Sequence, residues 1–82
     1  MHRTTPEFWE RFYALPNSVQ QLARKNFELL KNNQAHPSLR FKKVGDFWST
    51  RVGRNHRVLA LEDGNDFIWV WIGHHDEYDR LI

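Results

Sequence analysis

The longest apolar stretch of the chain is the run FIWVWI at residues 67–72, and it constrains the fold more than any other segment. The pattern Asp63-Gly64-Asn65 before it is typical of a tight hairpin turn, and Gly73 is expected to end it. Successive side chains of a strand point to opposite faces of a sheet, so this strand presents apolar side chains to both faces. We therefore expect an interior strand that other parts of the chain cover on each side.

Three further strands are predicted upstream, because the hydrophobic period changes to two after Pro37. They are expected at Leu39–Val44, Phe47–Val52 and His56–Glu62. Turn signals that begin at Gly45 and Gly53 separate these strands in the manner of short hairpins. Together with residues 67–72 they predict an antiparallel meander.

Two helices are predicted before this sheet. Thr5 and Pro6 form a helix start, with threonine as the N-cap and proline at the first helical position. A second helix is expected after Ser18, whose spacing to Gln21 fits a capping box. Its apolar stripe has helical spacing and consists of Val19, Leu22, Ala23, Phe27 and Leu30. The fold class is therefore α+β: an N-terminal helical hairpin packed on an antiparallel sheet, with a short C-terminal helix or turn.

A chain of 82 residues without cysteine has a thin core that neither disulfides nor thiolate-bound metal ions can stabilise. Four Trp, six Phe and two Tyr must therefore supply much of the buried apolar surface. The sequence shows no internal repeat or linker, so we expect one domain over residues 1–82. No apolar run approaches the roughly 20 residues that cross a bilayer, and the N-terminus has no apolar signal segment. We expect a cytoplasmic protein without a membrane partner.

Basic residues are concentrated in the centre of the chain, although the net charge is only +2. Six of them lie between residues 40 and 57 against a single acid, Asp46: Arg40, Lys42, Lys43, Arg51, Arg54 and Arg57. Such a block is typical of proteins that bind a polyanion, but it is equally compatible with an exposed hairpin face. Both interpretations stay open at this point.

Two arginines of this block are candidates for phosphate binding. Arg51 lies near the end of the second predicted strand and Arg57 at the start of the third, so the turn at residues 53–55 brings them close. Guanidinium groups form paired hydrogen bonds with phosphate and can stabilise the extra charge of a five-coordinate phosphorus. Lys42 and Lys43 point to opposite faces, so only one of them can face the same site.

A second group of ionisable residues follows the apolar strand: His74, His75 and then Tyr78. Histidine exchanges protons near neutral pH and therefore suits phosphodiester cleavage; the alternative is that both histidines are polar caps on the strand. Only one of these adjacent histidines is expected to face a site. The His-Glu-x-x-His zinc motif is absent and the possible ligands are consecutive, so we expect neither a metal site nor a cofactor.

Three segments in this order resemble the RelE/ParE superfamily of bacterial toxin–antitoxin systems: HPSLRFKK at residues 36–43, FWSTRVGRNHRVLA at residues 47–60 and WVWIGHHDEYDRL at residues 69–81. The resemblance implies a helical hairpin on a curved antiparallel sheet of three to four strands. For the RelE and YafQ branch it also implies a metal-independent endoribonuclease. Such an enzyme cuts mRNA, in most members on the ribosome, through attack by the RNA's own 2′-hydroxyl.

The resemblance also implies roles for individual residues. Arg57 corresponds to an arginine that contacts the scissile phosphate, Arg51 to a second basic position, and His75 to a proposed general acid. Tyr78 lies near a tyrosine that some members use, and His36 matches a histidine of the YafQ-like members. The remaining basic residues are expected to bind RNA: Arg40, Lys42, Lys43 and Arg54. The implied partners are a cognate antitoxin, mRNA and the ribosome, with no small-molecule substrate.

Two other functions share this fold. One is a ParE-like inhibitor of DNA gyrase, which has no chemical need for the pair Arg57 and His75; the other is an inactive member that only binds its antitoxin. The sequence also departs from the family pattern, because only His2–Thr4 could form the strand that opens most members. Ala60 stands where many members carry an aromatic residue, and the acidic stretch Asp76–Asp79 is unfavourable beside a polyanion.

Overall fold

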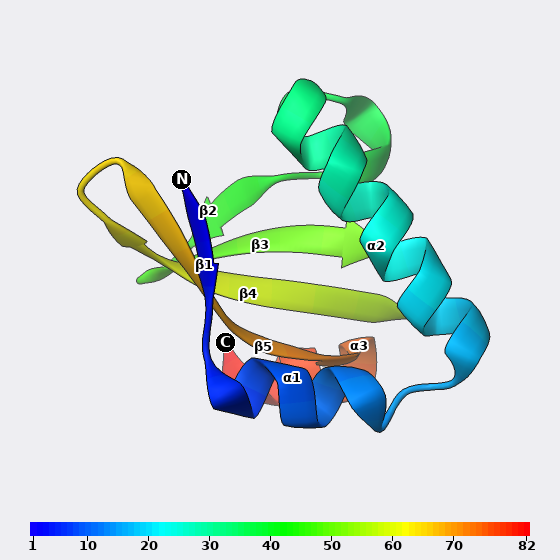
Figure 1. Cartoon of the computed structure of the whole chain (residues 1–82). Coiled ribbons are helices and arrows are strands. Elements are labelled where there is room, and N and C mark those ends of the chain that lie inside the picture. The colour runs from blue at the N-terminus through cyan, green and yellow to red at the C-terminus, as the bar shows by residue number, and fades with distance from the viewer.

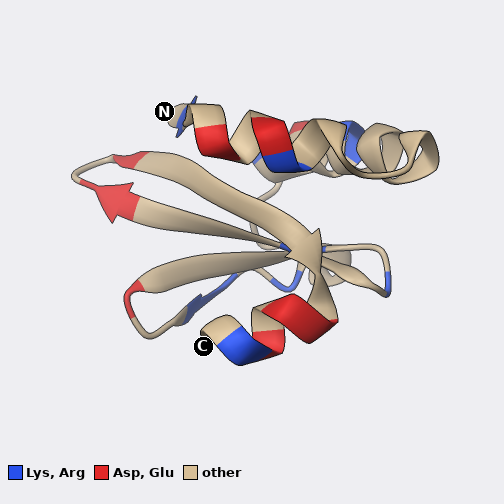
Figure 2. Ribbon diagram, turned by 90° about the horizontal axis from the view of Figure 1, so that it is seen from below, with Lys and Arg blue, Asp and Glu red and all other residues tan.

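The computed structural model describes residues 1–82 and shows a layered molecule (Figure 1). Its elements are, in chain order, β1 His2–Thr4, α1 Pro6–Tyr13, α2 Asn17–Asn32, the 3-10 helix η1 Pro37–Leu39, β2 Lys42–Val44, β3 Phe47–Val52, β4 His56–Asp63, β5 Asp66–His74 and α3 His75–Leu81. The helices α1 and α2 cover one face of the sheet, and α3 lies against the other (Figure 2). None of the helices is long and apolar enough to cross a membrane.

The strands form one five-stranded sheet in the order β1-β5-β4-β3-β2. Strands β2 to β5 pair as the predicted antiparallel meander, and the α+β fold class is confirmed. The prediction of three to four strands missed β1, which pairs parallel to β5 with His2 opposite Phe67. Three residues are too few to show a period of two. The opening strand typical of the superfamily is therefore present at His2–Thr4.

The strand β5 is the interior strand that the apolar run predicts. It lies between β1 and β4, with α1 against one face and α3 against the other. Gly73 does not end the strand as expected, because it pairs with Arg57 and the following His74 pairs with His56. The role of this glycine is steric: a Cβ here would lie 2.5 Å from Cζ2 of Trp71, so the indole ring needs the space that glycine leaves.

The helix α1 begins as predicted. Oγ1 of Thr5 accepts a hydrogen bond from the N–H of Phe8 at 3.2 Å, and Pro6 occupies the first helical position. Phe8 and Phe12 then share one face of the helix and are buried. The cap thus fixes where the helix starts and which aromatic face it lays on the sheet.

The start of α2 differs from the prediction. The helix begins at Asn17, before Ser18, and no side chain caps it. The carbonyl of Pro16 accepts hydrogen bonds from the N–H groups of Val19 at 3.0 Å and Gln20 at 3.1 Å. The proline therefore supplies the first helical acceptor, and the capping-box spacing of Ser18 has no role.

The first predicted strand is shorter than expected, because β2 covers Lys42–Val44 rather than Leu39–Val44. Residues Pro37–Leu39 form the 3-10 helix η1 instead, and the side chain of His36 caps it by accepting a backbone hydrogen bond. Arg40 then adopts a left-handed conformation with φ of 47°, which an extended strand does not allow. The chain therefore turns sharply before it enters the edge of the sheet.

Buried apolar side chains form two clusters, one on each face of the sheet. The larger cluster lies beneath α1 and α2 and consists of Phe8, Phe12, Leu30, Leu39, Val52, Val58, Ala60, Trp69 and Ile72. The smaller cluster lies beneath α3 and consists of Leu59, Trp71 and Tyr78. Because side chains alternate along β3, Ser49 and Arg51 share the face of the smaller cluster. This face is only partly apolar and has room for a polar pocket.

His2 on β1 is held among aromatic rings. Its Nδ1 accepts a hydrogen bond from Nε1 of Trp69 at 3.0 Å, and its ring stacks on Phe67 and Trp69. The pKa of His2 is lowered from 6.5, first by burial and then by the positive charges of the N-terminus and Lys31. The folded protein therefore binds fewer protons at this ring than the unfolded chain does.

This lowered pKa predicts a fold that is sensitive to acid. The stability that comes from a neutral His2 is fully present above pH 6.5 and is lost as the pH falls toward the lower pKa of the folded state. We expect His2→Gln to weaken the decrease in unfolding free energy between about pH 7 and pH 5, measured by urea denaturation. Burial also lowers the pKa of His56, so adding His56→Gln should weaken the decrease further. A wild-type slope in His2→Gln would refute this assignment.

Candidate functional site

A polar pocket of about 410 Å³ lies on the α3 face of the sheet. Its lining comes from the turn before β2, from β2, β3 and β4, and from α3: Arg40, Lys42, Ser49, Arg51, Arg57, His75, Tyr78 and Asp79. Figure 2 shows α3 on this face of the sheet, opposite α1 and α2. Since four of the eight lining side chains are cationic and one is a carboxylate, the pocket has the charge of an anion-binding site.

Arg51 and Arg57 stand directly opposite each other on β3 and β4, as the turn between them predicts. Nε of Arg51 donates to the carbonyl of Gly53 at 3.0 Å, and Nη1 of Arg57 donates to the carbonyl of His56 at 2.8 Å. These contacts position both guanidiniums and leave further N–H donors. Neither forms an ion pair with a carboxylate. Like charges directly opposite each other are destabilising, so a bound anion would stabilise this pair.

The strand β2 adds one lysine to the pocket. Lys42 pairs with Ser49, which shares a face with Arg51, whereas Lys43 pairs with Trp48. The two lysines therefore belong to opposite faces, and Lys42 is the one that lines the pocket. The sequence left open which of the two lysines faces the site, and the register of β2 against β3 determines that it is Lys42.

His75 enters the pocket from the first position of α3. Its backbone N–H donates to the carbonyl of Asn55 at 2.7 Å, which ties the start of α3 to the turn between β3 and β4. Its Nδ1 lies 3.4 Å from Oδ1 of Asp76 and 3.8 Å from Oδ2 of Asp79. These carboxylates orient the ring. His74 does not line the pocket, so His75 is its single imidazole.

Two lining residues, Ser49 and Asp79, were not among the predicted site residues. The sequence placed Asp79 in an acidic stretch that would oppose a polyanion, but its i, i+4 spacing from His75 puts both on one helix face. Ser49 lies two positions before Arg51 on β3, and strand alternation alone places them on one face. Tyr78 also lines the pocket, although its ring is buried in the smaller cluster.

Three predicted site residues lie outside the pocket: His36, Lys43 and Arg54. Nδ1 of His36 accepts a hydrogen bond from the N–H of Ser38 at 3.2 Å and lies 2.9 Å from its Oγ. Arg54 lies on the turn between β3 and β4, where its carbonyl accepts a hydrogen bond from Nη1 of Arg57 at 3.3 Å. His36 therefore acts as a cap and Arg54 as a turn contact, whereas Lys43 pairs with Trp48 and belongs to the other face of the sheet. Arg40 and the remaining predicted residues line the pocket.

Solved structures share this arrangement of layers over nearly the whole chain. A chain of the RelB–RelE antitoxin–toxin complex from Methanococcus jannaschii superimposes with a TM-score of 0.75 at 19% identity, with 98% of this chain and 99% of that chain covered. YafQ from E. coli BL21(DE3) gives a TM-score of 0.70 at 9% identity, with coverage of 95% and 96%. The isolated E. coli RelE toxin gives 0.66 at 8% identity, with coverage of 100% and 98%. The fold is therefore that of the RelE-like toxins.

The sequence itself identifies the family. Residues 17–80 match the ParE-like toxin domain, and this match covers most of the chain. The protein belongs to the ParE-like toxin family and thus to the RelE/ParE superfamily that its motifs resemble. A comparison with curated proteins gives no match.

Proposed function

We propose that this protein is the toxin of a type II toxin–antitoxin system and that it cuts mRNA without a metal ion. The observation that carries this proposal is the pair Arg51 and Arg57, which face each other beside the imidazole of His75 and have no carboxylate partner. A phosphodiester supplies the negative charge that this pair lacks, and the imidazole supplies a group for proton transfer. Membership of the ParE-like toxin family supports the class of protein.

The proposed reaction uses the RNA's own 2′-hydroxyl as the nucleophile. Its oxygen bonds to the adjacent phosphorus, the bond from phosphorus to the 5′-oxygen breaks, and the products carry a 2′,3′-cyclic phosphate and a 5′-hydroxyl. Arg51, Arg57 and Lys42 stabilise the extra negative charge of the five-coordinate phosphorus. His75 donates the proton that the departing 5′-oxygen needs, and the proton that the 2′-hydroxyl loses passes to water. The position of His36 outside the pocket supports His75 as this donor.

The proposed partners are a cognate antitoxin, mRNA and the ribosome, all in the cytoplasm. One structural neighbour is a chain of an antitoxin–toxin complex, which supports the proposal that an antitoxin is a partner of this protein. Four cationic side chains in the pocket can neutralise only a few phosphates, so binding to isolated RNA would be weak and sensitive to salt. A ribosome that holds the mRNA in place would make strong binding between the toxin and the RNA itself unnecessary.

Cleavage of a defined mRNA on purified ribosomes tests the proposed function. We expect cuts that leave a 2′,3′-cyclic phosphate on one product and a 5′-hydroxyl on the other. The same mRNA with a 2′-deoxynucleotide at the cleavage site lacks the nucleophile and should stay intact. Cleavage of the deoxy substrate, or no cleavage of either substrate, would show that the proposed chemistry is wrong.

The two other functions give different results in parallel assays. A gyrase inhibitor would leave the mRNA intact and would stop DNA supercoiling by purified gyrase. An inactive antitoxin partner would also leave the mRNA intact, but it would not stop supercoiling, and its expression alone would not arrest growth. Growth arrest together with new mRNA ends therefore distinguishes the ribonuclease from both.

A further inference from the structure

Three histidines gather where β4, β5 and α3 meet, beside the pocket. His74 ends β5, His75 begins α3, and His56 begins β4 opposite His74. The ring centroids of His74 and His75 are 4.5 Å apart, and those of His56 and His74 are 5.5 Å apart. The proposed cleavage uses only His75, so this concentration of imidazoles has no explanation in that reaction.

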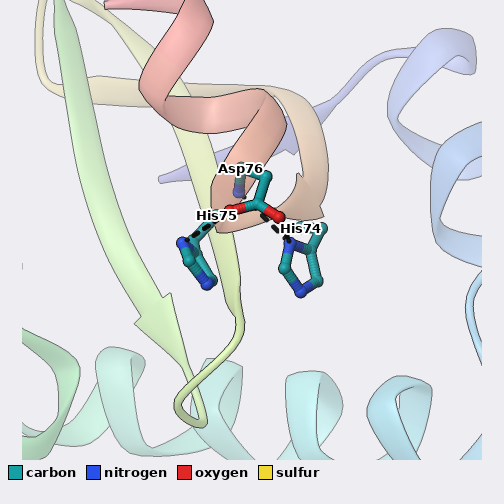
Figure 3. A group of neighbouring side chains, drawn as sticks. All are labelled: His74, His75 and Asp76. Carbon is teal, nitrogen blue, oxygen red and sulfur yellow. Dashed lines mark hydrogen bonds and ion pairs between the residues drawn. The ribbon is translucent and has the colours of Figure 1, made fainter.

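The carboxylate of Asp76 lies between the two adjacent imidazoles (Figure 3). Its Oδ2 is 3.5 Å from Nδ1 of His74, and its Oδ1 is 3.4 Å from Nδ1 of His75. Ligand atoms that are about 2.0–2.1 Å from a tetrahedral zinc ion lie about 3.3–3.4 Å from one another. All three ligand atoms are within 4.8 Å of one another, so small side-chain rotations would complete a site.

Consecutive residues converge here because the chain changes conformation between them. His74 is extended, with φ of −72° and ψ of 148°, whereas His75 is already the first residue of α3. The expectation of no metal site rested on these ligands being consecutive, whereas catalytic zinc usually takes two histidines a helical turn apart and a third, distant ligand. At the junction of strand and helix both rings come close to the carboxylate of Asp76, one on each side of it, as Figure 3 shows.

Helix capping explains only part of this arrangement. Nδ1 of His74 accepts a hydrogen bond from the N–H of Asp76 at 3.2 Å and thereby caps α3. Nδ1 of His75 has only the carboxylates of Asp76 and Asp79 near it. The side chains of His74, His75 and Asp76 are 43%, 37% and 68% exposed, so an ion can reach them and they can adjust to it.

We propose that His74, His75 and Asp76 bind one divalent transition-metal ion, such as Zn²⁺ or Ni²⁺. Nδ1 of each histidine and one carboxylate oxygen of Asp76 are the protein ligands, and water occupies the remaining position. Imidazole is a preferred ligand of these ions, and two histidines with one carboxylate form a common set of three ligands. The ion takes the place of the hydrogen bond by which His74 caps α3.

Metal binding here inhibits RNA cleavage, a consequence that rests on the proposed function. A histidine that acts as a general acid donates from the imidazolium, which carries protons on both ring nitrogens. An ion on Nδ1 of His75 excludes this protonated form, because a metal ligand must be deprotonated. The ring then cannot supply the proton that the 5′-oxygen needs. The metal ion is thus an inhibitor of the proposed enzyme and takes no part in its chemistry.

Calorimetric titration of Zn²⁺ into the untagged full chain tests the site. We expect one equivalent to bind to the wild type, and His74→Gln and Asp76→Asn to weaken binding by at least about 10–100-fold. His36→Gln removes an exposed histidine outside the cluster and should bind like the wild type. Asp76→Asn keeps the N–H that His74 caps, so it remains informative if His74→Gln unfolds. No saturable binding to the wild type, or wild-type affinity in folded Asp76→Asn, would overturn the proposal.

Cleavage assays separate the metal site from the proposed function. Zn²⁺ is expected to inhibit mRNA cleavage by the wild type and to leave His74→Gln active, since His74 lies outside the pocket. Equal inhibition of both proteins would show that the ion acts elsewhere. If the protein cleaves no RNA, the proposed function fails, while the titration still decides whether His74, His75 and Asp76 bind the ion.

Discussion

Arg57→Ala is expected to lower the rate of mRNA cleavage by about 10²–10³-fold. Arg57 stands opposite Arg51 in the pocket, and no carboxylate neutralises either guanidinium. Its charge is therefore available to the negative charge that develops around phosphorus, and alanine removes that stabilisation from the transition state. Single-turnover rates on ribosome-bound mRNA measure the loss without interference from product release.

Arg54→Ala is the comparison for this result, because it removes the same charge from the neighbouring turn. Arg54 does not line the pocket, and its backbone carbonyl is the group that contacts Arg57. We expect a nearly wild-type rate for Arg54→Ala and partial activity for Arg57→Lys, since lysine keeps the charge but loses the paired N–H donors. Equal losses of cleavage rate in Arg54→Ala and Arg57→Ala would mean that the basic residues only attract RNA through their overall positive charge, without a specific contact at the phosphate.

The fold could be predicted where a segment's own pattern determines its structure. The apolar run at residues 67–72 predicted the interior strand β5, and the turn signals predicted the meander. The strand at His2–Thr4 could not be predicted in this way, because its pairing depends on a strand near the other end of the chain. The predicted start of α2 was wrong because the carbonyl of Pro16, and not the side chain of Ser18, accepts the first hydrogen bonds of the helix.

The candidate site divides in the same way. A short turn made the approach of Arg51 and Arg57 predictable, since it leaves few possible registers for the two strands. The choice between Lys42 and Lys43 required the register of β2 against β3, which the sequence pattern does not contain. The place of His36 depends on the 3-10 helix η1, and no periodic pattern marks that element. Pairing across a short turn was predictable, and the register of β2 against β3 was not.

His75→Gln is expected to lower the cleavage rate by about 10²–10⁴-fold, the range typical of a lost general acid. Glutamine still forms hydrogen bonds but does not exchange protons near neutral pH. The backbone N–H of residue His75 donates to the carbonyl of Asn55 whatever the side chain, so the start of α3 should be preserved. His36→Gln removes an imidazole outside the pocket and should cleave at the wild-type rate.

A modified substrate shows whether the group lost in His75→Gln is a proton donor. When sulfur replaces the 5′-oxygen of the leaving group, it departs as a thiolate and needs no proton, because a thiol with a pKa of about 8.5 is far more acidic than an alcohol. His75→Gln should then cleave nearly as fast as the wild type, whereas Arg57→Ala should stay slow because the charge at phosphorus still needs stabilisation. Failure of this rescue would assign His75 a role in positioning the RNA. A large loss in His36→Gln would instead move the proton transfer to a residue that this structure keeps outside the pocket.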